Sequence, residues 1–406
     1  MADLLSVDDA LARVLAEAVA LPAEAVALKA ARGRYLSEDL HAALDLPPFA
    51  GSAMDGFAVR AADTPGTLRV AGESAAGRPF GGTVAPGEAV TISTGAVLPD
   101  GADTVVMLER AELDGDGATV TIAYQASAGD CVRPAGSDLR RGQRALEAGT
   151  RIGAIQVGAA AALGLARLPC RAQPRVAVLA TGDELRPPGE PLPPGAIYNS
   201  NGPMLEALLA EAGALTGDPR SVADSLAAHR QALTAALDDD VVITCGGVSV
   251  GPHDLVRDVQ RALGVHERFW GVALKPGKPL SFGVRERPGR SGPALAFGLP
   301  GNPISALVCF ELFVRPALEA LQGASQPHPR FAPGLLAAAV ARHPERDQMI
   351  RVRRDSSDRL EPLRGQQSHQ ITLSAGAHGL ARIPAGHGEL AAGAKVNYLP
   401  LGASRE

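Results

Sequence analysis

The sequence is poor in cysteine, in aromatic residues and in positive charge. Its four cysteines lie far apart and form no CxxC pair, which argues against a zinc knuckle or a secreted disulfide framework and favours a reducing cytosol. Aromatic residues make up 3% of the chain, and the formal net charge is −5. A nucleic-acid partner, which needs a basic surface and stacking side chains, is therefore not expected.

Long hydrophobic runs are also missing. The most apolar window, residues 152–166, contains several glycines and is flanked by Arg151 and Arg167, and it is too short to cross a membrane as a helix. The first residues include acids and lack the basic segment of a signal peptide. We therefore expect a cytoplasmic protein that has no membrane segment.

The length of the chain predicts several domains, because 406 residues exceed the usual size of about 150 residues per domain. Residues 6–31 and 141–170 have helical patterns, and we expect residues 1–44 and 141–173 to form one discontinuous helical domain. Short Val/Thr/Ile runs between Gly, Pro and Asp predict an inserted β domain over residues 45–140. Similar runs after a Pro-rich linker predict a small C-terminal β domain over residues 328–406.

Residues 174–323 alternate apolar strand patterns with amphipathic helices, which is typical of a doubly wound α/β domain with a mainly parallel sheet. Ligands of such domains bind outside the carboxyl ends of the strands. Three segments lie at predicted strand ends: TGDEL, GGVSVGPHD and GLPGNP. Gly246 and Gly247 permit close backbone approach, and Asn302 before Pro303 is a good helix start for holding an oxyanion. The alternative is that these segments are only tight turns.

Acids and lysines accompany these loops. Glu184, Asp224 and Asp254 have the oxygen ligands that Mg²⁺ prefers. Of the 39 basic residues only four are lysines, yet Lys275 and Lys278 stand together in LKPGKP. Compact ammonium groups suit a phosphate or an oxyanion. The alternatives are that the acids are helix caps and that the lysines cluster by chance on a solvated loop.

A second enzyme class fits one of these loops. GVSVG, residues 247–251, matches the Gly-x-Ser-x-Gly pattern after a strand, so an α/β-hydrolase with Ser249 as the nucleophile is an alternative. A hydrolase would not need the lysine pair, and the acids near this loop would not help an oxyanion. We therefore expect Ser249 to shape the backbone of the loop.

Nine motifs in order give the chain a specific resemblance. They are SAMDGFAV, TGAVLPDGADTVV, VRPAGSD, TGDEL, IYNSN, GGVSVG, LKPGKP, GLPGNP and GQQSH. Together they resemble the molybdopterin molybdenumtransferases, the bacterial MoeA family that is related to the C-terminal part of gephyrin. The resemblance implies an enzyme that takes adenylylated molybdopterin and molybdate, inserts the metal with Mg²⁺ and releases AMP. It also implies a three-layer molybdopterin-binding α/β domain and a small C-terminal β-barrel domain.

The resemblance further implies a homodimer whose cleft lies between the α/β domain of one subunit and the β domain of the other. A molybdopterin adenylyltransferase and apo-molybdoenzymes are further partners that it implies. By motif position, the functional polar residues are Asp55, Thr94, Asp138, Glu184, Asp224 and Asp254. The substrate-binding set is Gly246, Gly247, Ser249, Lys275, Lys278, Pro279, Pro300, Asn302, Ser305, Arg351 and Ser368.

The chain departs from the family pattern at Gly271, where family members often carry a basic residue. The role of that position must then be absent here or be met by another side chain. A catalytically inactive scaffold of the same fold remains an alternative, although a scaffold would have no need to retain the acids and lysines.

Overall fold

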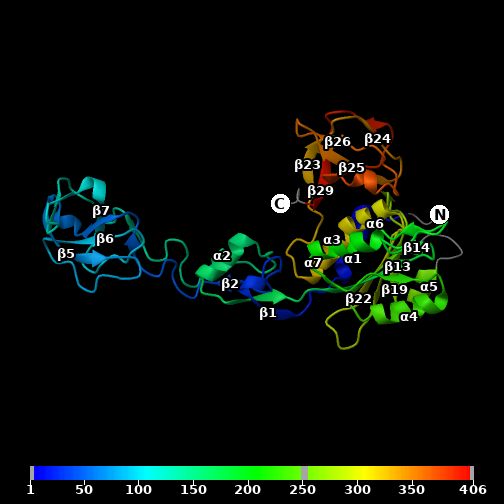
Figure 1. The fold of residues 1–406 in the computed structure, drawn as a ribbon, viewed down its shortest axis with the longest axis horizontal. Coiled ribbons are helices and arrows are strands. Elements are labelled where there is room, and N and C mark those ends of the chain that lie inside the picture. Colours follow the sequence, from blue (N-terminus) through cyan, green and yellow to red (C-terminus); the bar gives the residue numbers. More distant parts are fainter. Residues whose placement is uncertain (1–3, 248–254, 403–406) are drawn as a thin grey trace.

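The computed structural model describes residues 4–247 and 255–402. The chain forms an extended arm and a two-part body (Figure 1). A β domain lies at the tip of the arm, a slender middle region connects it to the body, and the body consists of an α/β domain and a C-terminal β domain. None of the helices in the described residues is long and apolar enough to span a bilayer.

The β domain at the tip contains one mixed sheet, in the order β7-β4-β6-β5-β9-β8. Its strands are β4 (Gly56–Val59), β5 (Gly66–Ser74), β6 (Glu88–Ile92), β7 (Thr104–Met107), β8 (Glu112–Leu113) and β9 (Thr119–Ile122). Alternate residues face two separate cores: Phe57 and Val106 pack on one face, and Ala58 and Val105 on the other. Apolar residues at successive positions therefore form strands that are buried on both faces.

The middle region consists of paired strands and one short helix, α2 (Ala154–Ala162). Antiparallel pairs join β1 (Ala23–Ala27) with β12 (Arg167–Arg171), β2 (Leu40–His41) with β11 (Arg144–Leu146), and β3 (Gly51–Ser52) with β10 (Val132–Arg133). Each pair joins one segment before the β domain to one segment after it.

The helix predicted over residues 6–31 is wrong beyond Glu17. Helix α1 (Val7–Glu17) starts at Ser6, whose side chain accepts a hydrogen bond from the Asp9 amide. Pro22 then prevents continuation of the helix, and residues 23–27 pair with β12 instead. The structure also differs from a helical domain over 1–44 and 141–173, because Val14 of α1 packs in the core of the α/β domain with Leu205 and Phe313.

The α/β domain contains the large sheet, in the order β16-β13-β18-β22-β21-β19, with β17 also paired to β13. Its strands are β13 (Arg175–Thr181), β16 (Leu215–Thr216), β17 (Arg220–Val222), β18 (Val241–Cys245), β19 (His266–Trp270), β21 (Ser281–Arg285) and β22 (Ala294–Leu299). The pairs from β16 to β22 are parallel, and β21 and β19 form an antiparallel edge. The predicted mainly parallel sheet is confirmed.

Helices cover both faces of this sheet. The helices are α3 (Asn201–Glu211), α4 (Leu226–Ala236), α5 (Leu255–Ala262), α6 (Pro303–Cys309) and α7 (Arg315–Leu321), with a π-helical turn, Phe310–Val314, between the last two. Val178 of β13 packs with α1, α3, α6 and α7, whereas the next residue, Leu179, packs with α4 and α5. A separate short parallel pair joins β14 (Leu185–Arg186) and β15 (Ile197–Tyr198).

The C-terminal domain is built on a sheet in the order β20-β25-β27-β29-β23. Its strands are β20 (Leu274–Lys275), β23 (Ala332–Leu335), β25 (Asp347–Arg354), β26 (Leu360–Pro362), β27 (Gly379–Ile383) and β29 (Lys395–Pro400); β24 (Val340–Ala341) pairs with β28 (Glu389–Leu390). Strand β26 pairs with β25, and Leu336 bridges Leu360. Because β20 comes from the α/β segment of the chain, the sheet joins the two domains.

Candidate active site

The candidate site lies where the strand order reverses. After β13, the chain first adds β16 and β17 on one side of that strand. It then crosses over and adds β18 on the other side. Such a reversal opens a crevice outside the carboxyl ends of the strands. Thr181, Cys245 and Leu299 are the last residues of β13, β18 and β22, so all three segments singled out in the sequence begin at this edge.

Gly246 directly follows β18, at the edge where the strands end. Its amide donates a hydrogen bond to the carbonyl of Leu299 at 3.1 Å, and its φ is +98°. A Cβ atom there would lie 2.7 Å from the carbonyl oxygen of Thr181. Both the backbone conformation and the space therefore require glycine. Gly247, with φ +65°, continues the turn.

Two predicted metal-binding acids stand at the same edge. Glu184 follows β13, and Asp224 follows β17, whose Val222 pairs with Thr181. The carboxylate of Asp183 accepts a hydrogen bond from the Asp224 amide at 3.1 Å and so ties the two loops together. Both Glu184 and Asp224 are exposed. The third predicted ligand, Asp254, lies outside the described residues, and those residues contain no group of three potential metal ligands.

A buried histidine supports Asp224. His229 of α4 is 3% exposed, and its Nε2 lies 3.7 Å from Oδ1 of Asp224. Burial lowers the pKa of His229, and the nearby Asp224 and Asp183 carboxylates oppose that shift. His229 therefore lies next to the Asp224 carboxylate, on the protein side of it.

The lysine pair lies on the connection between the α/β and C-terminal domains. Lys275 ends β20, which pairs with β25 of the C-terminal domain. Lys275 and Lys278 are both exposed, and Pro279 is half-buried. Between the lysines, Gly277 has φ +122°, and a Cβ atom there would lie 3.0 Å from Sγ of Cys309 in α6. The turn is thus packed tightly on α6, which leaves the two ammonium groups at the surface.

The start of α6 contacts the C-terminal domain directly. Nδ2 of Asn302 donates a hydrogen bond to Oγ of Ser368 at 3.0 Å, and the Ile304 amide donates to the Ser368 carbonyl at 2.9 Å. Pro300 and Ser305 are buried, and the Pro300 carbonyl accepts a hydrogen bond from the Cys245 thiol at 3.4 Å. The structure therefore brings Asn302 and Ser368 together. Pro300 and Ser305, close to Asn302 in the sequence, are buried and do not reach the surface.

Arg351 is buried, unlike the two exposed lysines. It is 1% exposed in the middle of β25, and its guanidinium donates hydrogen bonds to the loop that precedes Ser368. Burial lowers its pKa. The prediction that it contacts substrate stays untested, but in this structure the side chain faces the protein and not solvent.

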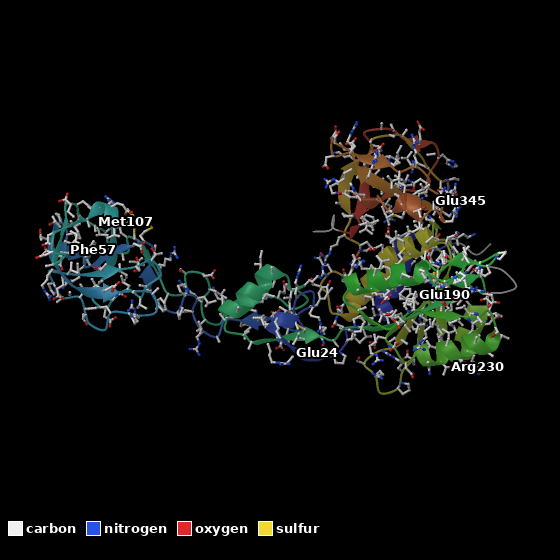
Figure 2. All side chains as sticks on the ribbon, in the orientation of Figure 1. Glu24, Phe57, Met107, Glu190, Arg230 and Glu345 are labelled. Atoms are coloured by element: carbon white, nitrogen blue, oxygen red, sulfur yellow. The ribbon has the colours of Figure 1, made fainter. Side chains whose placement is uncertain are left out.

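The remaining predicted residues belong to the arm. The Thr94 amide donates a hydrogen bond to Oδ1 of Asp55 at 2.7 Å, and Asp55, Thr94 and Asp138 are exposed. Within one chain the β domain and the strand-end crevice lie at opposite ends of the molecule; Phe57 and Met107 mark the first and Glu190 the second (Figure 2). The predicted site is thus divided into two separate groups. Ser249, the nucleophile of the hydrolase alternative, lies outside the described residues.

Sequence reasoning missed some residues that shape the crevice. Asp183 and His229 orient Asp224, and Nδ2 of Asn201 donates a hydrogen bond to the Gly301 carbonyl at 2.7 Å. Asp183 and Asn201 stand inside the recognised motifs TGDEL and IYNSN, so their position was a usable signal. His229 reaches Asp224 from the first turns of α4, and no pattern in the sequence marked it.

Gly271 has a structural explanation. Its φ is +89°, its amide donates to the Leu280 carbonyl at 2.8 Å, and a Cβ atom would lie 2.9 Å from the side chain of Leu4. A basic side chain at this position would need a different backbone conformation and a shifted Leu4.

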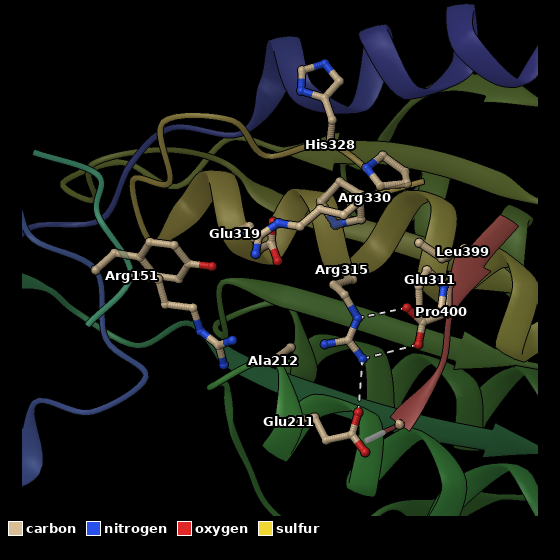
Figure 3. Close-up of a pocket in the computed structure, with 14 residues that line it drawn as sticks. Arg151, Glu211, Ala212, Glu311, Arg315, Glu319, His328, Arg330, Leu399 and Pro400 are labelled. Atoms are coloured by element: carbon tan, nitrogen blue, oxygen red, sulfur yellow. Dashed lines mark hydrogen bonds and ion pairs between the residues drawn. The ribbon is translucent and has the colours of Figure 1, made fainter. Parts of the chain in front are cut away.

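A distinct pocket of about 370 Å³ lies where the middle region, the α/β domain and the C-terminal domain meet (Figure 3). Arg315 in its wall pairs with Glu311 at 2.8 Å and with Glu211 at 3.4 Å. Burial, and secondarily the Glu319 carboxylate, raise the pKa of Tyr35 in this pocket to about 12. Its lining contains none of the predicted site residues, so this pocket is separate from the loops at the strand ends.

Comparison with known proteins gives matches in chain order. Residues 5–164 match the MoeA N-terminal region (domain I and II), residues 177–320 a probable molybdopterin binding domain, and residues 333–401 the MoeA C-terminal region (domain IV). The chain is 39% identical over 328 residues to a molybdopterin molybdenumtransferase of Haemophilus influenzae, which covers 80% of this chain and 79% of that protein.

Two further relatives extend the similarity over nearly the whole length. Molybdopterin molybdenumtransferase 2 of Mycobacterium tuberculosis is 38% identical over 390 residues, 93% of this chain and 94% of that protein. A solved structure of the molybdopterin biosynthesis MoeA protein from Pyrococcus horikoshii superposes with a TM-score of 0.82 at 31% identity, covering 98% and 99% of the two chains. These matches confirm the resemblance indicated by the motifs and give no support to a hydrolase or an inactive scaffold.

Proposed function

Because this chain belongs to the MoeA family, we propose that it is a molybdopterin molybdenumtransferase that acts in molybdenum cofactor biosynthesis. The observation that carries the proposal is the strand-end crevice, whose segments lie within the match to a probable molybdopterin binding domain. The substrates are adenylylated molybdopterin and molybdate, and the products are AMP and the molybdenum cofactor.

The groups around the crevice suit these substrates. The turns at Gly246 and Gly301 approach each other closely, with 3.6 Å from a Cβ at Gly301 to the Gly246 Cα, and glycine at both positions leaves the backbone without side chains to block a ligand. Lys275 and Lys278 offer compact positive charge for a tetrahedral dianion such as molybdate. Ser368 and Asn302 add polar groups on the wall beside α6.

Glu184 and Asp224 fit a bound Mg²⁺. Both are exposed carboxylates, and within the described residues neither forms an ion pair with a lysine or an arginine, so their oxygens are available to a cation. Mg²⁺ is commonly held by one or two carboxylates together with substrate phosphates and water. When bound, it would neutralise phosphate charge as the phosphoanhydride is cleaved. Asp183 would hold the backbone of Asp224 through its amide, and His229 lies beside the Asp224 carboxylate.

A homodimer would reunite the two groups of predicted residues. Asp55, Thr94 and Asp138 cannot reach the strand ends of their own chain, because they belong to the arm, which extends away from the body (Figure 1). We propose that they complete the crevice of a second copy. The exposed apolar surface of α2 supports pairing: over the residues described, the structure buries Ala160 of this helix and leaves Ile155 82% exposed.

The test is incubation of the purified full chain with adenylylated molybdopterin, Mg²⁺ and molybdate while AMP release is followed. We expect AMP release that depends on Mg²⁺, together with product that activates a molybdenum-free apo-enzyme. A folded, dimeric protein that binds the substrate but releases no AMP would contradict the proposed activity. Omission of molybdate separates cleavage from metal insertion.

A further inference from the structure

The side chain of Arg351 is bound almost completely by one loop of the C-terminal domain. Nη1 donates a hydrogen bond to the Gln366 carbonyl at 3.2 Å, and Nη2 donates to the carbonyls of Gly365 and, at 3.2 Å, Gln367. Nε donates to Oγ of Ser374 at 3.1 Å. Three consecutive carbonyls therefore converge on a single planar cation, a geometry that the fixed fork of a guanidinium matches and a lysine does not.

Gln366 completes the attachment from the loop side. Its Oε1 accepts a hydrogen bond from the Arg351 amide at 3.0 Å, and its Nε2 donates to the carbonyls of Arg351 and Leu363, both at 2.9 Å. The side chain of residue 351 holds the loop backbone, and the side chain of residue 366 holds the backbone of residue 351. This reciprocal bonding explains physically why arginine and glutamine stand at these two positions.

The next residue of the loop is the one that reaches the crevice. Ser368 follows Gln367 directly; its Oγ accepts a hydrogen bond from Asn302, and its carbonyl accepts one from the Ile304 amide. These two bonds attach the loop to the first turn of α6. A displacement of residues 365–367 would carry Ser368 away from α6, since adjacent Cα atoms are only 3.8 Å apart.

We propose that Arg351 is a positioning residue that acts on the active site through residues 365–368 and not through its own contact with molybdate. It fixes the loop so that Ser368 stands against Asn302 at the wall of the crevice. A buried side chain whose hydrogen bonds are satisfied in this way can hold a functional residue in one orientation. The part of this inference that concerns molybdate rests on the proposed function; the part that concerns the loop does not.

The charge of Arg351 agrees with an internal role. At 1% exposure the cation is separated from solvent, and the carbonyl dipoles replace its hydration. Four of its five N–H groups are used by the loop and Ser374, and burial lowers its pKa. The exposed Lys275 and Lys278 provide the positive charge that meets the anion.

The experiment compares Arg351→Lys with Arg353→Lys in the full-length protein. Arg353 is the matched control, because it lies on the same strand but is exposed and pairs with Glu361 at 2.7 Å. Hydrogen–deuterium exchange is followed at the Ile304 amide, whose acceptor is Ser368, and over residues 363–371. We expect Arg351→Lys to speed exchange at Ile304 at least tenfold and to leave the amides of β27 and β29 unchanged, with no change in Arg353→Lys.

Enzyme kinetics supply the second readout. Arg351→Lys should raise the KM for molybdate roughly tenfold, the effect of one lost hydrogen bond, with a smaller change in kcat. In a Ser368→Ala background the same substitution should have little further effect, because Arg351 acts through that residue. Unchanged exchange at Ile304 together with a raised KM would overturn the proposal in favour of direct contact. Faster exchange throughout the C-terminal domain would overturn it in favour of a general role in folding.

If the protein shows no transferase activity, the exchange experiment still decides the positioning role of Arg351. Loss of Ile304 protection in Arg351→Lys, with β27 protected as before, would support the attachment of the loop independently of any reaction.

Discussion

Asn302 and Ser368 form a hydrogen bond of 3.0 Å across the boundary between the α/β and C-terminal domains. Asn302 precedes the first residue of α6, and Ser368 lies in the loop held by Arg351. The contact places the C-terminal domain at the wall of the strand-end crevice. The pairing of β20 with β25 brings the lysine turn to the same domain boundary, so both domains of the body contribute residues to the candidate site.

The lysine turn provides the most direct test of the anion site. Lys275→Ala or Lys278→Ala should weaken molybdate binding roughly ten- to a hundred-fold, because each removes a charge-assisted hydrogen bond of about 1.5–3 kcal/mol. Arginine at either position should restore binding only in part, since a planar fork fits a tetrahedral anion less well. The measurement is the molybdate dependence of cofactor formation.

Lys395→Ala is the matched control, because Lys395 is an exposed lysine of β29 outside this turn. Wild-type molybdate dependence in all the Lys275 and Lys278 variants would show that the pair is only a solvated loop.

The two acids at the strand ends should be needed for the Mg²⁺-dependent step. We expect Glu184→Gln and Asp224→Asn to reduce AMP release at least a hundred-fold while the thermal unfolding midpoint changes little, because both side chains are exposed. Glu190→Gln is the control, since Glu190 is an exposed acid that lies beyond β14, a few residues further along the chain. If both variants turn over normally, the acids are structural and the cation binds elsewhere.

A site shared between two subunits should permit complementation. At a molybdate concentration near the wild-type KM, Asp55→Asn and Lys275→Ala should each strongly reduce the activity of the homodimer, because each alters one residue of every site. When the two variants are co-expressed, the mixed dimer contains one site that carries both substitutions and one that is intact. We therefore expect activity to return to up to half of the wild-type value per mixed dimer. Absence of recovery in an isolated mixed dimer would place both residues in the same subunit's site.

The raised pKa of Tyr35 should make the stability of the protein fall at alkaline pH. Its pKa is raised from 10.0 to about 12 by burial and by Glu319, with Arg151, Arg330 and Arg315 opposing. The folded state therefore holds the proton more tightly than the unfolded state, so this stabilisation is complete below pH 10 and is lost as the pH rises towards about 12. The loss should reach about 2–3 kcal/mol, at 1.36 kcal/mol per pKa unit.

The measurement is the free energy of unfolding in denaturant between neutral pH and pH 12. Tyr35→Phe should remove this part of the pH dependence, whereas Tyr124→Phe, in the β domain, serves as the control for loss of a hydroxyl elsewhere. An identical alkaline slope in Tyr35→Phe and wild type would contradict the assignment.

Much of the fold could be predicted from the sequence because local patterns determined it. The alternation of apolar runs with amphipathic helices over residues 174–323 reflects a sheet covered on both faces, where strands must be apolar throughout and helices need one apolar side. The same reasoning failed for residues 18–31, whose alanine-rich sequence favours a helix. There Pro22 and the pairing of residues 23–27 with β12 outweighed helix propensity.

The sequence by itself determined the family, the strand-end loops and the chemical character of the site, because glycines, acids and paired lysines stand next to predicted strand ends. Only the tertiary structure decided how they assemble. It buried Arg351 beneath the Ser368 loop, placed His229 next to Asp224, and put Asp55 and Thr94 together on the arm, away from the body. Some of these contacts are between residues that are distant along the chain. Others are between neighbouring elements whose relative orientation depends on packing. Residue type and spacing contain no information about which of these side chains faces the crevice and which supports it from within.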